Sequence, residues 1–292
     1  MKPNVFLVGA AKAGTSALSN FLSQHPEVYM SPIKEPYFFV ENRHIETKSE
    51  YLQLFKNSTR EKVLCEASTG YLYDNSSAVL IKKFCSSAKI IISLRNPIDM
   101  AFSFWKYMSI HGSENLPFFD AINDFSNRTS ERFIKNCAGR PENYLYIERA
   151  KYFEQVKRYY DVFGANSVKV VLFEQFSSEP FKVLQDIFHF LNVEKSFKPN
   201  ISVINKGGEI RFEWLKKIRN KKYPLLKKFI PLLLRDKIRL FIRDINVKKG
   251  KSVRLTSEER VSLYNVFEQD VLKLRKLTGI DLSLWDEFKG VN

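Results

Sequence analysis

The sequence has few cysteines and no long apolar run, and each of these two shortages excludes a class of protein. It also contains no internal repeat. Its 292 residues contain only three cysteines, Cys65, Cys85 and Cys137, which are too few and too widely spaced for a disulfide framework or a metal knuckle. No apolar run approaches the roughly 18 residues that a membrane-spanning helix needs. Disorder is excluded as well, because 44% of the residues are apolar and 25 are phenylalanine.

Acidic residues are scarce beside basic ones, and the formal net charge is +15. Nearly all of the excess lies between Lys216 and Arg254, where 15 lysines and arginines face two aspartates, a balance of +13. Three interpretations of this basic segment are open: a solvated face over a helical subdomain, a lip that binds an anionic acceptor, and a surface for peripheral contact with an anionic membrane. Nucleic acid is not expected as a partner, because no recognition-helix motif or RNA-binding aromatic signature accompanies the charge.

The length fits one domain over residues 1–292 with a substantial core. We divide it into an α/β nucleotide-binding core over 1–199, a basic loop and helical insert over 200–255, and a C-terminal helix and tail over 256–292. The first motif begins within ten residues of Met1, so we expect no signal peptide. Together with the scarcity of cysteine, this predicts a cytoplasmic location.

The stretch from Val5 to Ala17, VFLVGAAKAGTSA, has the pattern of a phosphate-binding loop. Its apolar start predicts a buried parallel strand, and apolar residues at helical spacing after the loop predict a helix. Small residues between the two let backbone N–H groups converge on an anion at the helix N-terminus, where the macrodipole also favours negative charge. Lys12 adds a full positive charge to the loop, and Thr15 and Ser16 add hydroxyl donors.

Alternating strands and helices follow this motif. The pattern predicts strands over 27–31, 63–70, 89–94 and 168–173, and helices over 49–55, 76–84, 98–108, 116–125, 144–163, 180–191 and 256–277. Thr256 and Glu259 form a capping box at the start of the last helix, and Gly279 supplies its stop. Such alternation predicts a parallel sheet, whose binding sites lie at the carboxyl ends of its strands. Residues 9–16, 66–70 and 95–97 all fall at such ends.

The opening loop differs from the P-loop of nucleotide hydrolases. There, Gly, four residues, Gly, Lys and Ser or Thr let the lysine reach the β and γ phosphates while the hydroxyl holds magnesium. Gly9 and Gly14 keep that spacing, but Thr15 stands at the lysine position and Lys12 lies inside the loop. No predicted strand ends in a lone aspartate for magnesium, and the strand over 89–94 leads into Arg95, which suits a second phosphate.

Two alternatives remain open on the residues alone. One is a metal-dependent kinase or nucleoside triphosphatase that uses residues 9–16, against which stand the place of the lysine and the missing aspartate. The other is a non-catalytic polyanion or membrane-surface binder built around residues 216–254, whose binding would be strongly salt-dependent.

Two of these motifs together resemble the sulfotransferases that use 3′-phosphoadenosine 5′-phosphosulfate (PAPS). Their 5′-phosphosulfate loop typically has the sequence Lys-x-Gly-Thr-Ser or Thr, and residues 12–16 are KAGTS. Their 3′-phosphate motif is an arginine after a buried strand, with a proline close behind and a serine eight residues downstream, as in Arg95, Pro97 and Ser103. The resemblance implies an α/β P-loop-like fold with a central parallel sheet flanked by helices, to which a basic helical C-terminal subdomain would be added.

The resemblance extends over most of the chain. Residues 34–39, KEPYFF, are similar to the Lys-Glu-x-x-Phe-Phe segment of the carbohydrate-type branch, in which the glutamate is the proposed general base. Residues 65–72, CEASTGYL, are similar to the family's Gly-Glu-x-Ser/Thr-x-x-Tyr-Leu strand end, with Cys65 in place of glycine. Heparan-type members carry a lysine where this chain has Ala67, which argues against a heparan-like acceptor.

The resemblance implies an in-line transfer of a sulfuryl group from PAPS to a hydroxyl or amine, and no metal is required. The acceptor would be a carbohydrate or other small metabolite, for which an anionic compound is left open, and the nucleotide product would be adenosine 3′,5′-bisphosphate (PAP). Glu35 would take the acceptor proton, and Lys12 would stabilise charge on the leaving phosphate. His111 is the alternative base. The expected donor-binding residues are Ala11, Lys12, Ala13, Gly14, Thr15, Ser16, Ala17, Arg95, Ser103, Lys206, Gly207, Gly208 and Arg211, and the acceptor-side residues are Lys34, Glu66, Ser68, Thr69 and His111.

Overall fold

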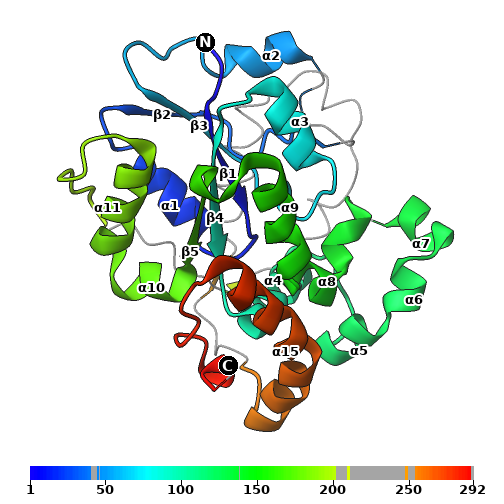
Figure 1. The fold of residues 1–292 in the computed structure, drawn as a ribbon. Helices are drawn as coiled ribbons and strands as arrows, with labels where there is room; N and C mark the ends of the chain where they lie inside the picture. The colour runs from blue at the N-terminus through cyan, green and yellow to red at the C-terminus, as the bar shows by residue number, and fades with distance from the viewer. Residues whose placement is uncertain are drawn as a thin grey trace.

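A five-stranded parallel sheet forms the centre of the molecule (Figure 1). The computed structural model describes residues 1–40, 45, 47–137, 139–201, 209–210, 247–248 and 254–290. The strands are β1 (Val5–Gly9), β2 (Val28–Met30), β3 (Val63–Ala67), β4 (Lys89–Leu94) and β5 (Val168–Leu172). Their order across the sheet is β2-β3-β1-β4-β5, and every pairing between them is parallel. The predicted α/β fold with a central parallel sheet is confirmed.

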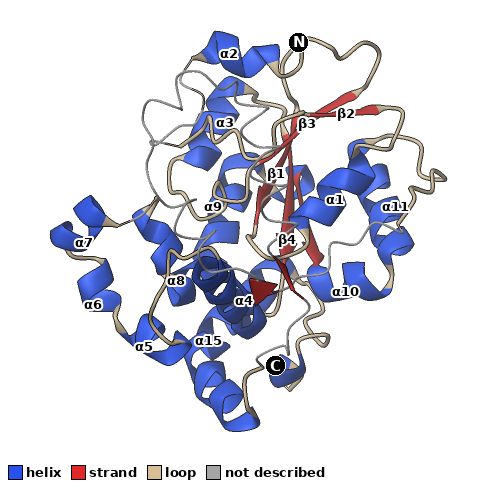
Figure 2. Ribbon diagram, turned by 180° about the vertical axis from the view of Figure 1, so that it is seen from behind, coloured by secondary structure: helices blue, strands red, loops and turns tan. Residues whose placement is uncertain are grey.

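Both faces of the sheet are covered by helices, so alternate residues of each strand enter two separate cores. In β1, Phe6 and Val8 enter one core, while Val5 and Leu7 enter the other. Figure 2 shows the two helical layers, one on each side of the strands. One layer contains α1 (Thr15–Leu22), α10 (Phe173–Ser178) and α11 (Pro180–Leu191), and the other contains α3 (Ser77–Phe84), α4 (Pro97–Ile110), α9 (Phe153–Phe163) and α15 (Ser257–Thr278).

Several element boundaries follow directly from local sequence signals. Strand β4 and helix α11 begin and end at the predicted residues. The capping box at the start of α15 is formed, since Thr256 Oγ1 accepts from the backbone N–H of Glu259 and the Glu259 carboxylate accepts from that of Thr256. Gly279 ends this helix with φ of 65°, a left-handed conformation that suits glycine. Short turns of 3₁₀ helix lie at Pro141–Tyr144, Ala165–Ser167 and Asp286–Phe288, and α2 spans Lys48–Gln53.

The single helix predicted over 144–163 is wrong. The chain forms α8 (Tyr146–Ala150), breaks, and begins again as α9 at Phe153. Asp270 on α15 explains the break, because its carboxylate accepts hydrogen bonds from the backbone N–H groups of Tyr152, at 2.6 Å, and Phe153, at 3.2 Å. A distant carboxylate therefore caps α9, which the local amphipathic pattern does not reveal.

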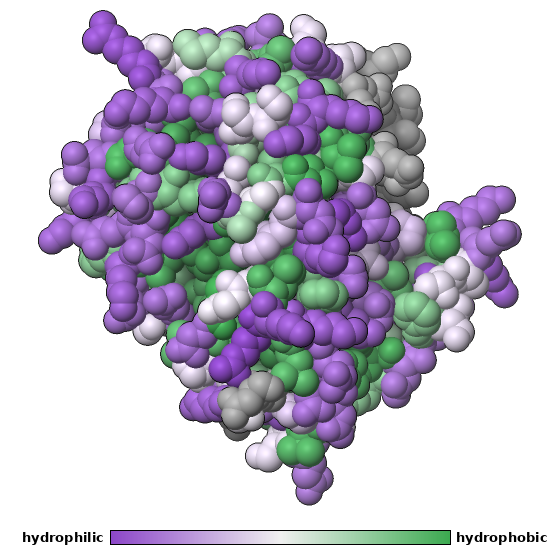
Figure 3. Space-filling model, viewed as in Figure 1, coloured by the Kyte–Doolittle hydropathy of each residue, from purple (hydrophilic) through white to green (hydrophobic). Residues whose placement is uncertain are grey.

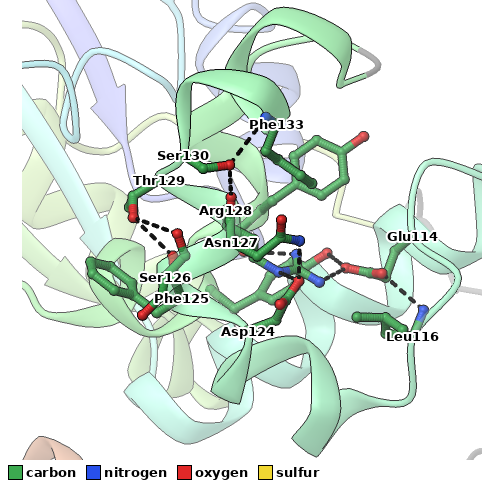
Figure 4. A network of polar contacts seen from close by, with 12 residues as sticks. Glu114, Leu116, Asp124, Phe125, Ser126, Asn127, Arg128, Thr129, Ser130 and Phe133 are labelled. Atoms are coloured by element: carbon green, nitrogen blue, oxygen red, sulfur yellow. Dashed lines mark hydrogen bonds and ion pairs between the residues drawn. The ribbon is translucent and has the colours of Figure 1, made fainter.

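The single helix predicted over 116–125 is also interrupted. It forms α5 (Phe118–Asn123) and α6 (Phe125–Arg128), and with α7 (Glu131–Asn136) these make an arm that projects from the body (Figure 1). A buried ion pair of 2.8 Å between Arg128 and Glu114 fixes the arm (Figure 4). The Tyr146 hydroxyl on α8 donates to the same carboxylate at 2.8 Å. Arg128 therefore joins the arm to the core through a paired buried charge.

Most of the basic segment lies outside the described residues. This includes the expected donor-binding residues Lys206, Gly207, Gly208 and Arg211. Two short strands in this part of the sequence, β6 (Glu209–Ile210) and β7 (Val247–Lys248), pair as an antiparallel two-stranded ladder. The division of the chain at residues 199 and 255 stays a prediction. In the part of the chain that is described, no helix is both long and apolar enough to span a membrane. The face shown in Figure 3 is dominated by hydrophilic side chains.

Candidate active site

The loop between β1 and α1 is closely packed against the carboxyl end of β4. The Ala10 backbone N–H donates to the Ser93 carbonyl at 2.6 Å, and the Ser93 hydroxyl donates to the Ala13 carbonyl at 2.6 Å. Gly14 has φ of 75°, and a Cβ there would lie 2.7 Å from the Phe173 ring. Glycine is therefore required at position 14 both by conformation and by space. Sequence analysis did not identify Ser93 or Phe173, because nothing local shows that they support this loop.

The loop leads into the open N-terminus of α1. The first helical hydrogen bond runs from the Leu18 N–H to the Gly14 carbonyl at 3.0 Å, so the amides of residues 15–17 precede the ladder. The first turn contains no acidic side chain. Unpaired amides and the helix dipole thus favour an anion at this position.

Lys12 brings the main positive charge to the loop. Its backbone is left-handed, with φ of 63°, and its ammonium lies 4.7 Å from the centre of the Tyr107 ring. Burial, together with the positive charges of Arg95 and Lys34, lowers the pKa of Lys12 to about 8, while the charge of Glu35 acts in the opposite direction. These charges from three separate segments therefore surround one site, which carries an excess of positive charge.

Arg95 lies at the end of β4, beside the loop. One terminal nitrogen, Nη1, donates to the Lys12 carbonyl at 3.3 Å, and the guanidinium lies 4.9 Å from the centre of the Phe173 ring. Its buried Nε has no hydrogen-bond partner, and among the described residues no carboxylate forms an ion pair with it. Ser103 follows in the second turn of α4 and is half-buried. The predicted phosphate-binding arginine thus lies beside the loop with an unused donor, which fits an anionic ligand.

Glu35 lies in the loop that faces α1. Its Oε1 accepts a hydrogen bond of 2.8 Å from the Thr69 hydroxyl and lies 3.9 Å from the Lys34 ammonium. The Lys34 ammonium in turn donates to Ser16 Oγ at 2.5 Å, which connects this loop to the start of α1. The backbone of Glu35 is left-handed, with φ of 58°, and its N–H donates to the Ala67 carbonyl at 2.8 Å. Two anchors to neighbouring segments hold this strained conformation in place.

Glu66 and Ser68, which we expected to contact the acceptor, are both buried. Glu66 is only 1% exposed, and its two oxygens accept from the hydroxyls of Tyr51 and Ser68, each at 2.5 Å. Burial raises the pKa of Glu66 to about 7, although these hydroxyls oppose the shift. Its carboxylate therefore binds two protein hydroxyls inside the fold. We correct the expected contact with the substrate to a role in supporting the chain that leads to Thr69. The sequence pattern could not distinguish the two, because both place the residue at a strand end.

His111 is the C-cap residue of α4. Its Nδ1 is 2.7 Å from the Tyr107 carbonyl, and its ring lies 3.9 Å from the Tyr107 ring, which is the ring that the Lys12 ammonium also contacts. Tyr107 is itself a site residue that sequence analysis missed. Its spacing of four residues from His111 on one helix is the signal that could have suggested it.

Comparison with known protein families agrees with the anion-binding geometry of the loop and Arg95. The family model of the sulfotransferase domain matches residues 2–275. The chain belongs to the sulfotransferase domain family. Membership confirms the predicted class of enzyme, a transferase of sulfur-containing groups, with PAPS as its donor. A solved sulfotransferase from Alicyclobacillus acidocaldarius has a similar fold, with a TM-score of 0.74 and 30% identity over 98% of this chain and 99% of that one.

Similar curated sulfotransferases are larger proteins. The bifunctional heparan sulfate N-deacetylase/N-sulfotransferase 1 of Mus musculus is 24% identical over 271 residues, which cover 85% of this chain and 29% of that protein. The heparan sulfate glucosamine 3-O-sulfotransferase 3B1 of Mus musculus is 24% identical over 259 residues, which cover 85% of this chain and 64% of that protein. The chain spans 22% to 29% of the length of the bifunctional relatives.

Proposed function

We propose that this sulfotransferase transfers the sulfuryl group of PAPS to a hydroxyl or amine of a carbohydrate or other small metabolite, with Glu35 as the general base. The supporting observation is the position of the Glu35 carboxylate. It lies 3.9 Å from Lys34, whose ammonium is bound to Ser16 at the start of α1, and its charge acts on the pKa of Lys12 in the phosphate loop. A carboxylate so close to the anion site is suited to remove a proton as transfer begins.

On the donor side, the loop amides and Lys12 would bind the 5′-phosphosulfate, and Arg95 with Ser103 would bind the 3′-phosphate. The open amides of α1 and the Nε of Arg95 support this division, because none of these donors has an acceptor among the residues that the structure describes. The charge that develops on the leaving phosphate oxygen would meet the ammonium of Lys12, a preorganised electrostatic stabilisation.

The atoms and charges of the step balance. The acceptor oxygen or nitrogen forms a new bond to sulfur, and the bond from sulfur to the phosphate oxygen breaks. The acceptor proton passes to the Glu35 carboxylate, and the electron pair of the broken bond leaves on PAP. The role of His111 as an alternative base and the cytoplasmic location stay predictions.

The test is the substitution Glu35→Gln, which keeps the shape of the side chain and removes its basicity. With any acceptor that the wild type sulfates, we expect PAP release to slow by roughly 10² to 10⁴-fold, while PAP affinity stays within about twofold. Glu131→Gln, at an exposed position on the arm, is the matched control and should leave both unchanged. Turnover of Glu35→Gln near the wild-type rate would assign the base elsewhere, with His111→Ala the next variant to measure.

A further inference from the structure

Arg149 on α8 is a buried cation on which the charge of Glu142 acts without a direct contact. Its side chain is among the buried polar groups, with the residue 6% exposed, and its Nε has no hydrogen-bond partner. Within the described part of the chain, no carboxylate forms an ion pair with it. Arg128, which is also buried, differs because it pairs with Glu114 at 2.8 Å. An unpaired buried charge is costly, so a protein rarely retains one without a ligand or another compensating group.

The side chain of Arg149 borders a small cavity beside the phosphate loop. Ala10, Ala11, Thr69 and Tyr73 are among the other lining residues, and the cavity has a volume of about 10 Å³. That space admits about one water-sized group, such as a single oxygen of a larger anion. Thr69 also donates to Glu35 at 2.8 Å, so the cavity lies one side chain away from the proposed base.

Aromatic rings hold the guanidinium in place. Its Cζ lies 5.0 Å from the centre of the Tyr73 ring and 4.9 Å from that of Phe104. Contacts with ring faces leave the N–H groups at the edge of the guanidinium for an anion, as the planar fork of arginine favours. The geometry therefore provides a positioned donor rather than a mobile surface charge.

Tyr37 links this cation to the base. Burial raises the pKa of the Tyr37 hydroxyl, as does the charge of Glu35, whereas the positive charge of Arg149 opposes the increase. A second arginine, Arg140, has its Cζ 5.1 Å from the centre of the Tyr37 ring. Arg140 is paired with Glu142 at 2.5 Å, and the Glu142 charge also acts on the pKa of Arg149 without forming an ion pair with it. Of the two arginines beside Tyr37, Arg149 is therefore the one that makes no ion pair with a described carboxylate.

We propose that Arg149 binds an anionic oxygen of the acceptor, so that the acceptor already carries a carboxylate or sulfate group beside the hydroxyl or amine that is modified. This inference rests on the proposed function, because it assumes that the acceptor lies next to Glu35. It assigns substrate selection to a residue of the folded core, independently of the basic segment over 216–254.

The experiment measures binding of D-glucuronate, with D-glucose as its neutral counterpart, to the protein saturated with PAP at constant ionic strength. We expect saturable binding of D-glucuronate that is at least about tenfold tighter than that of D-glucose. Arg149→Met should abolish this preference, and Arg149→Lys, which keeps the charge but not the fork, should reduce it. Arg132→Met, an exposed arginine on the arm, should leave it unchanged.

Three results would overturn the inference. The first is that the wild type does not bind D-glucuronate more tightly than D-glucose. The second is that Arg149→Lys, or a folded Arg149→Met protein, keeps the full preference for D-glucuronate. The third is that Arg149→Met loses affinity for PAPS but not for PAP. The last result would assign Arg149 to the sulfuryl group of the donor. Thermal unfolding shows whether Arg149→Met folds, and Arg149→Lys decides the question if it does not. Failure of the wild type to bind PAP would instead refute the proposed function.

Discussion

The indole N–H of Trp285 donates a hydrogen bond of 3.0 Å to Oε2 of Glu174, and Oε1 of the same carboxylate accepts one of 2.9 Å from the backbone N–H of Asn96. Asn96 follows Arg95 directly, and the Tyr152 hydroxyl donates to the Arg95 carbonyl at 3.0 Å. The C-terminal tail therefore holds the turn that presents the arginine to the site. Burial raises the pKa of Glu174, which these hydrogen bonds oppose.

Loss of this tether should affect both stability and donor binding. We expect Trp285→Phe to lower the free energy of unfolding by about 2 kcal/mol, because one oxygen of a buried carboxylate loses its donor. PAP binding should weaken by up to about tenfold, the equivalent of one hydrogen bond. Denaturant unfolding and calorimetric titration measure the two effects. The control is Trp105→Phe, which removes a comparable hydrogen bond from an indole N–H to the Leu116 carbonyl. Equal PAP affinity in the two variants would show that Trp285 does not hold the turn of Arg95 in place.

Arg95 should contribute more to donor affinity than any neighbouring hydroxyl. Because a charge-assisted contact with a phosphate is lost, we expect Arg95→Ala to weaken PAP binding by about tenfold to a hundredfold. Ser103→Ala should have a smaller effect of about fivefold, as for a neutral hydrogen bond. Titration calorimetry measures both, with Arg132→Ala as the control. If Arg95→Ala binds PAP as tightly as this control does, the 3′-phosphate lies elsewhere.

The pKa of Lys12 predicts how donor affinity depends on pH. Since that pKa is lowered to about 8, the ammonium is charged below this pH and loses its proton above it in the free protein. PAP affinity should therefore fall as the pH rises from about 8 to 9.5, and Lys12→Arg, which stays charged, should remove this dependence. Affinity of the wild type that stays flat over this range would contradict the assigned role of Lys12.

The lowered pKa of Lys12 also makes the stability of the protein depend on pH, but in the direction opposite to that of donor affinity. The folded pKa of Lys12 lies below the unfolded value, so the unfolded chain binds more protons between about pH 8 and 10.5. The contribution of Lys12 to the free energy of unfolding therefore rises with pH over this window. Unfolding of the wild type and Lys12→Met at several pH values separates this contribution from those of other groups.

The sequence predicted the features that depend on local signals. The apolar run of β4, the capping box of Thr256 with Glu259 and the stop at Gly279 are each determined by neighbouring residues, and each was confirmed. The loop motif and Arg95 were recognisable because anion binding needs particular residue types at fixed spacing after a strand.

Features that depend on distant partners could not be predicted in this way. Asp270 interrupts a helix from 118 positions away, and Trp285 supports a turn through Glu174 from 111 positions away. The burial of Glu66 and the unpaired charge of Arg149 likewise exist only once the tertiary packing has formed. No local pattern records whether a charged residue will find a partner there.

Thermal stabilisation by PAP compared with ATP and Mg²⁺ tests the assignment of the donor site most directly. Because PAP carries both the 5′-phosphate and the 3′-phosphate that the loop and Arg95 are expected to bind, we expect saturating PAP to raise the Tm by roughly 5 °C or more. ATP with Mg²⁺ should raise it clearly less, and Arg95→Ala should remove most of the difference. Equal or greater stabilisation by ATP with Mg²⁺ would contradict a PAPS-binding site and favour a kinase or nucleoside triphosphatase.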